Sequence, residues 1–196
     1  MSTRTKLAPE DQLTIEEFLA FTDTRPDGER WELIEGVAIM NPSPVEFHQV
    51  IVATILTHLM VHKQRAAASW LPMPGVGTRV PASPRSLPQP DVFVKEAAAT
   101  SFPVTEDALV LFEVLSRSNS RADQAWRRKV YASVPNCQHF VTVSLKAVVV
   151  DVYDREIAWK KRSFERLSEA LTLPAIGVAM PLADIYRWTP LGTDTN

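Results

Sequence analysis

The spacing of apolar residues along the chain has two periods, one typical of helices and one typical of strands. Helical spacing occurs over residues 14–21, 45–68, 122–133 and 182–186. Short apolar runs that indicate strands occur over 31–34, 37–40, 76–80, 91–94, 108–115, 140–143, 147–153 and 157–164. The first two runs flank Glu35-Gly36, a turn sequence that predicts a β-hairpin. Together these elements predict an α/β (α+β) fold, in which helices flank a mixed sheet.

The run over 108–115 is apolar apart from Glu113, as expected for a central strand that is buried on both faces. The helix that follows should return the chain to the strand at Phe140, so these two strands should be parallel. We expect a single domain over 13–188, because neither a linker nor a repeat divides the 196 residues. Residues 1–12 and 189–196 are expected to be disordered tails.

Composition narrows the classes of function. The formal net charge is −2, so any binding of nucleic acid requires a local basic patch. The single cysteine, Cys137, excludes a disulfide within the chain and favours a reducing compartment, so we expect a cytoplasmic protein. The polar N-terminal residues do not resemble a signal peptide, and we expect no membrane segment and no organic cofactor. His58 and His62 lie four apart on a predicted helix, a spacing compatible with a shared metal, but without a third ligand they are expected to be surface residues.

Acidic residues within apolar strands are the candidate chemistry. Glu113 lies in the apolar run over 108–115, and Asp91 precedes Val92-Phe93-Val94. A buried lone carboxylate is costly unless a cation, an arginine or an open cleft compensates it, so a salt-bridged Glu113 is one alternative. Paired carboxylates also bind Mg²⁺ or Mn²⁺, and this favours a metal site. Glu32 is a third acid of this kind, either part of the site or facing solvent on the hairpin.

Basic residues follow Glu113 along the chain. Asp123, Arg127 and Tyr131 are spaced by four and should share one face of a helix. Nearby positive charges that suit a phosphate backbone are Arg117, Arg121, Arg128 and Lys129, and a second basic cluster spans 155–166. The alternative interpretation is a solvated helix and a solvated edge strand.

Several segments, in this order, resemble the PD-(D/E)XK restriction endonuclease-like superfamily, and more narrowly its Uma-type family of nucleases. The segments are Trp31-Glu32-Leu33-Ile34-Glu35-Gly36, Pro42-Ser43-Pro44 before His48-Gln49, Gln89-Pro90-Asp91-Val92, Glu113-Val114-Leu115-Ser116, and Asp123 followed by Tyr131. The resemblance covers about 14–186.

The resemblance implies a nuclease-type core, usually assembled as a homodimer, that acts on DNA with Mg²⁺ or Mn²⁺. Asp91 and Glu113 would bind the metal with the backbone carbonyl of Val114, and Glu32 would be an accessory acid. His48, Arg117, Arg121 and Lys129 are candidate contacts to nucleic acid. The plain superfamily motif has a lysine where this chain has Leu115, and the Uma-type family has a lysine where it has Arg127. Arginine stabilises a phosphate but cannot act as a base.

Three functions compete on this basis. The leading one is a metal-dependent DNA endonuclease in which Arg127 stabilises the charge that develops on phosphorus. The second is a weak or inactive nuclease-fold module that binds nucleic acid or a protein partner. The third is a structural protein, for which an uncharged cleft and a broad apolar surface are expected.

Overall fold

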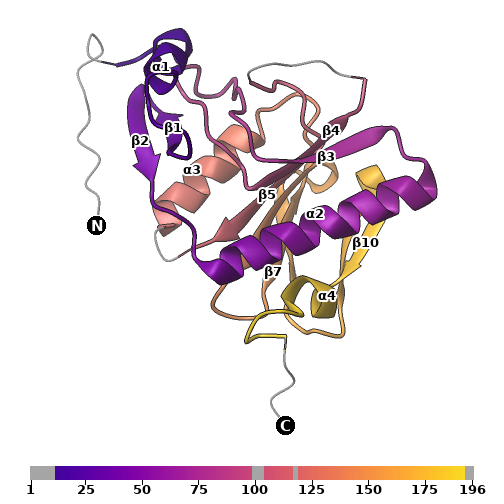
Figure 1. The fold of residues 1–196 in the computed structure, drawn as a ribbon. Helices are drawn as coiled ribbons and strands as arrows, with labels where there is room; N and C mark the ends of the chain where they lie inside the picture. The colour runs from indigo at the N-terminus through magenta and orange to yellow at the C-terminus, as the bar shows by residue number, and fades with distance from the viewer. Residues whose placement is uncertain (1–11, 99–103, 117–118, 193–196) are drawn as a thin grey trace.

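A six-stranded mixed sheet forms the centre of the computed structural model, which describes residues 12–98, 104–116 and 119–192 (Figure 1). In spatial order the strands are β3 (Trp70–Pro74), β4 (Val92–Glu96), β5 (Val110–Leu115), β6 (His139–Ser144), β7 (Val150–Asp154) and β8 (Lys160–Phe164). β5 and β6 are parallel, and the other neighbouring pairs are antiparallel. Because α3 (Arg121–Tyr131) connects β5 to β6, the predicted parallel crossover is confirmed.

Two small antiparallel sheets and further helices complete the fold. The strand pairs are β1 (Arg30–Ile34) with β2 (Val37–Asn41), and β9 (Ala170–Leu173) with β10 (Val178–Pro181). The remaining helices are α1 (Ile15–Thr22), α2 (Glu46–Ala66) and α4 (Leu182–Tyr186), with short 3-10 helices η2 (Arg155–Ile157) and η3 (Pro174–Ile176). The predicted hairpin is confirmed, and its turn has φ of 50° at Glu35 and 79° at Gly36, the left-handed values that a tight hairpin turn requires. Each helix of the described ranges is too short or too polar to cross a bilayer.

α2 and α3 cover opposite faces of the sheet, and this decides where the side chains of β5 point (Figure 1). Phe112 of β5 belongs to the core cluster that includes α2, whereas Leu111 belongs to the cluster with Tyr131 of α3. Successive side chains of a strand alternate between faces. Glu113 therefore projects from the α3 face of a strand that is otherwise apolar.

The hairpin is fixed to the loop that precedes β4. Leu33, Leu87 and Phe18 of α1 form a small separate core. The Leu87 N–H donates to the Leu33 carbonyl at 2.7 Å, and the Gly36 N–H donates to the Arg85 carbonyl at 2.7 Å. These contacts bring the hairpin, and Glu32 with it, alongside the segment that ends at Asp91.

Some predicted boundaries are wrong. The segment 76–80 is not a strand: within it Thr78 forms one isolated bridge, and the strand lies earlier, at β3. The sequence did not predict β3 because Pro72 and Pro74 are typical of loops. Proline is tolerated in a strand at the edge of a sheet, and β3 is such an edge strand. The strand expected over 157–164 begins at β8, after η2. Residues 1–11 and 193–196 of the expected tails lie outside the described residues, whereas Thr189 is buried.

Gly75 permits a close approach of two backbone segments beside Asp91. A Cβ atom at this position would lie 1.6 Å from the carbonyl oxygen of Pro90. The Gly75 N–H donates to the Asp91 carbonyl at 3.1 Å, so the contact holds the residue that follows Pro90 in place.

We expect Gly75→Ala to reduce the free energy of unfolding by about 1–3 kcal/mol, because overpacking against backbone forces the chain apart. Urea denaturation measures this loss. Gly28→Ala is the comparison: nothing lies within 4 Å of its added Cβ, so only its positive φ contributes, at about 1 kcal/mol. Equal stability of the two variants would show that the contact at Gly75 is unimportant.

Candidate active site

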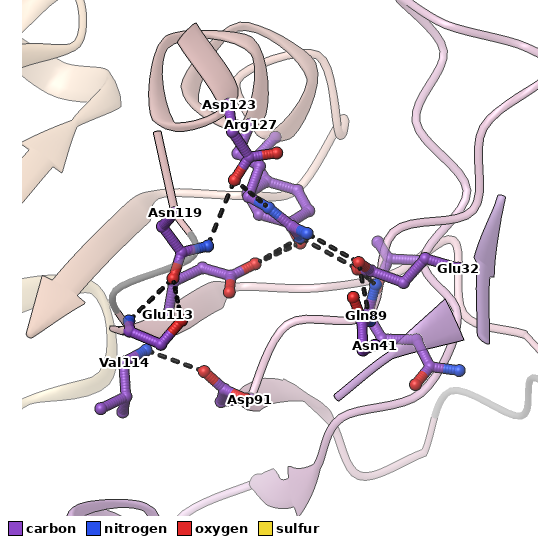
Figure 2. A network of polar contacts seen from close by, with 12 residues as sticks. Glu32, Asn41, Gln89, Asp91, Glu113, Val114, Asn119, Asp123 and Arg127 are labelled. Carbon is purple, nitrogen blue, oxygen red and sulfur yellow. Dashed lines mark hydrogen bonds and ion pairs between the residues drawn. The ribbon is translucent and has the colours of Figure 1, made fainter. Parts of the chain in front are cut away.

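The Arg127 guanidinium lies at the centre of a buried ion-pair network (Figure 2). Its Nη1 and Nη2 donate to Oε1 and Oε2 of Glu32 at 3.0 and 2.7 Å, which makes a bidentate pair. Nη1 also donates to Glu113 Oε1 at 2.8 Å, and Nε donates to Asp123 Oδ2 at 3.3 Å. Arg127 is 7% exposed, so these charges meet away from water. One guanidinium thus faces three carboxylates.

Glu113 has one occupied oxygen and one available oxygen. Its Oε1 accepts hydrogen bonds from Arg127 Nη1 and from the Tyr131 hydroxyl, each at 2.8 Å. Its Oε2 accepts no hydrogen bond from any residue of the described chain. Burial raises the pKa of Glu113 to about 8, although the adjacent Arg127 lowers it. The ionised carboxylate is therefore costly here without a further cation.

Both oxygens of Glu32 are fully engaged. Besides the Arg127 pair, Oε1 accepts from the Gln89 N–H at 2.6 Å, and Oε2 accepts from Asn41 Nδ2 at 3.0 Å. Burial raises the pKa of Glu32, but Arg127 and these hydrogen bonds outweigh it and hold the pKa below its usual value. Glu32 is 3% exposed, so the alternative of a solvent-facing hairpin carboxylate is wrong. The structure makes Glu32 the anchor of Arg127.

Asp91 immediately precedes β4 and lies beside Val114. Its Oδ2 accepts from the Val114 N–H at 2.8 Å, and its own N–H donates to the Phe112 carbonyl at 2.9 Å. The N–H and C=O groups of one strand residue point to the same side, and residues two apart repeat that direction. The Val114 carbonyl therefore points toward the edge where Asp91 lies. Arg30 Nη2 is 3.7 Å from Asp91 Oδ1.

His48 packs against Asp91 from the first turn of α2. Its Nε2 is 3.1 Å from Asp91 Oδ2, and the residue is 6% exposed. The other ring nitrogen, Nδ1, is buried and has no hydrogen-bond partner in the described part of the chain. His48, a predicted contact to nucleic acid, lines the cleft and contacts the carboxylate that is the candidate metal ligand.

These groups line a cleft of about 820 Å³. It holds three acidic and three basic side chains, those of Glu32, Asp91, Glu113, Arg30, Arg127 and Lys146. Among the described residues, no cluster of three or more His, Cys, Asp or Glu side chains forms a ready metal site. The donors that fit a hard divalent cation are Asp91, Glu113 Oε2 and the Val114 carbonyl, with water completing the shell. An oxygen-only set of this kind suits Mg²⁺ or Mn²⁺.

The other predicted basic residues lie elsewhere. Arg121 and Lys129 are exposed on α3 and are not among the residues that line the cleft. Arg117 lies outside the described residues. In the second basic cluster, Arg155 donates to the Cys137 and Val134 carbonyls at 2.5 and 2.7 Å, a structural role at the end of α3.

Sequence reasoning did not select Arg30, Asn41, Asn119 or Lys146, all of which line the cleft. The position of Lys146 could have been predicted from the parallel pairing of β5 and β6. Parallel strands end at the same edge of a sheet, so the turn after β6 must lie beside the end of β5. Asn119 accepts from the Ser116 N–H at 2.8 Å and donates to Asp123 Oδ2 at 3.2 Å, so it closes the network on that side.

A mixed sheet flanked by helices, with Asp91 and Glu113 in one cleft, is the arrangement of a restriction endonuclease-like fold. The model of the Uma2 family, described as "Putative restriction endonuclease", matches residues 15–183, and the chain belongs to this family. The crystal structure of a putative nuclease of DUF820 from Anabaena variabilis is similar in fold. Its TM-score is 0.73 at 15% identity, over 90% of this chain and 98% of that chain. No curated protein matches the chain. The predicted family and fold class are confirmed.

We expect Glu32→Ala to reduce the free energy of unfolding by roughly 3–5 kcal/mol, because it leaves the Arg127 guanidinium buried with one of its three carboxylate partners removed. Chemical denaturation followed by circular dichroism measures the loss. Glu16→Ala is the matched control, since Glu16 forms an ion pair with Arg79 at the surface and its loss should have little effect. Equal small effects would mean that the buried network does not stabilise the fold.

Proposed function

We propose that the protein is a metal-dependent nuclease that hydrolyses phosphodiester bonds in DNA. The observation that carries this proposal is the meeting of Asp91, Glu113 and Arg127 in one cleft. A structural protein without this activity would have an uncharged cleft, and this cleft holds three acids and three cations.

Asp91, Glu113 Oε2 and the Val114 carbonyl would hold Mg²⁺ or Mn²⁺. The cation supplies charge neutralisation at the phosphate and lowers the pKa of water. The protein's own groups fix where this happens. The Val114 N–H and His48 orient Asp91, while Arg127 and Tyr131 hold Glu113 Oε1 and leave Oε2 toward the cleft.

Arg127 is our candidate for stabilising the charge that develops on phosphorus, since it lines the cleft. Glu32 positions it through the bidentate pair. Arg127 keeps its proton at neutral pH, so it does not act as a general base. Solvent or another group would therefore remove the proton from the attacking water.

A second candidate function is binding without cleavage. The observation that favours it is the commitment of all three Arg127 nitrogens to carboxylates. An arginine held in this way has less freedom to reach a phosphate than a lysine would have.

We also propose a cytoplasmic homodimer. Between Glu46 and Lys63, α2 contains no Asp, Glu, Lys or Arg, and Met60 and Val61 are each 39% exposed on it. An uncharged, partly apolar helix face suits contact with its own copy across a twofold axis. Sedimentation should show a dimer that Met60→Lys weakens; a wild-type monomer at high concentration would exclude it.

We expect the wild-type protein to nick supercoiled plasmid with Mg²⁺ or Mn²⁺, and Glu113→Gln to reduce the rate on the order of 100-fold or more. Mutation of residues that only orient metal ligands already reduces metal affinity or activity by roughly 10–100-fold, and Glu113 is a candidate ligand itself. Agarose gels with EDTA blanks measure the rate, and circular dichroism confirms folding. Glu156→Ala, an exposed acid outside the cleft, is the control. Binding of plasmid without cleavage by wild type would favour the second candidate.

A further inference from the structure

Two cations of the cleft are not committed to the central network. Arg127 already forms ion pairs with three carboxylates, which leaves Arg30 and Lys146 as the less engaged cations. Arg30 reaches only 3.7 Å from Asp91, and its side chain is 36% exposed. Lys146 is exposed, and its Nζ contacts no acidic partner among the described residues. With a divalent cation beside Asp91 and Glu113, the three acids and three basic side chains would carry a net positive charge, which attracts a polyanion.

The fold sets Lys146 beside the acidic pair. In the parallel register of β5 and β6, Leu115 lies opposite Ser144. Lys146 follows two residues later, in the turn before β7, where its N–H donates to Ser144 Oγ at 3.1 Å. It therefore flanks the end of the strand that carries Glu113, and this placement suits contact with a phosphate next to the reacting one.

The wall of the cleft formed by the β2–α2 connection is apolar. Pro42, Pro44, Val45 and Phe47 line it. Val45 is 60% exposed and Phe47 is 41% exposed, so an aromatic ring faces solvent in a cleft that also contains six charged side chains. Apolar groups beside a phosphate-binding site indicate a ligand that presents both charge and a flat apolar face.

A nucleic acid strand has that chemistry only when its bases are unpaired. An intact duplex presents phosphates and sugars to such a wall and keeps the faces of its bases stacked inside. An unpaired strand offers base faces, and aromatic side chains stack on them without regard to sequence. The cleft volume of about 820 Å³ also falls within the range of roughly 300–1,000 Å³ typical of small-ligand sites, enough for part of one strand.

We propose that the cleft binds an unpaired DNA strand, with Phe47 stacked on a base and Arg30 and Lys146 on the neighbouring phosphates. This inference rests on the proposed function and specifies its substrate class: single-stranded DNA, or duplex DNA at frayed or flapped positions. Phe47 and Lys146 are binding residues in this account.

The test is fluorescence anisotropy with the full chain in Ca²⁺, using a labelled single strand of about 15 nucleotides and the matched blunt duplex. Wild type should bind the single strand at least about tenfold more tightly. Phe47→Ala should weaken single-strand binding about tenfold and hardly change duplex binding. Lys146→Ala should lower the slope of log affinity against log salt by about 0.7.

Matched controls are Trp188→Ala, an aromatic that is 70% exposed, and Lys160→Ala, an exposed lysine; neither lines the cleft, and both should bind like wild type. Equal affinity for the two DNAs, or full affinity in Phe47→Ala, would overturn the inference. So would a change in sedimentation of Phe47→Ala with DNA binding intact, which would assign the apolar wall to contact between copies.

Binding and cleavage separate this inference from the proposed function. Selective binding of the single strand without any plasmid or oligonucleotide cleavage would leave the inference standing and remove the nuclease activity. Cleavage that depends on Glu113, together with equal affinity for the two DNAs and single-strand binding unaffected by Phe47→Ala, would do the reverse.

Discussion

The bidentate ion pair between Arg127 and Glu32 is the contact on which the site depends. It joins α3 to the N-terminal hairpin across the end of the central strand, and both residues are buried. Because desolvated charges are costly, such a pair persists only when every polar atom has a partner, and here Gln89 and Asn41 complete the shell of Glu32. The pair fixes the guanidinium, and the guanidinium in turn fixes one oxygen of Glu113.

The same network leaves the site short of positive charge. Among the described residues, Arg127 forms ion pairs with Glu32, Glu113 and Asp123. The ion-pair partners that the described residues offer Asp91 are His48 and, at 3.7 Å, Arg30. A divalent cation between Asp91 and Glu113 would offset this excess. Arg127 stands where the resemblance implies a lysine, and its planar guanidinium with five donors suits the centre of this network.

Much of this architecture was predictable, because local patterns were strong. The apolar run around Glu113 indicated a central strand, and spacing by four put Asp123, Arg127 and Tyr131 on one helical face. The alternation of apolar and polar residues did not predict β3, because Pro72 and Pro74 are typical of loops. β9 and β10 are too short to show a clear alternation. The bidentate partner of Arg127, Glu32, comes from the hairpin, nearly 100 residues earlier. That contact depends on the packing of the hairpin against the loop before β4, and the place of Lys146 depends on strand order, so neither follows from a local pattern.

The central claim is a divalent-cation site formed by Asp91 and Glu113, and isothermal titration calorimetry with Mn²⁺ tests it most directly. Wild type should bind one ion per chain. Asp91→Asn should weaken that binding at least about tenfold and stay folded, whereas Lys160→Ala, far from the cleft, should bind as wild type does. Unchanged Mn²⁺ affinity in a folded Asp91→Asn protein would contradict the account, because the carboxylate would then have no part in holding the metal.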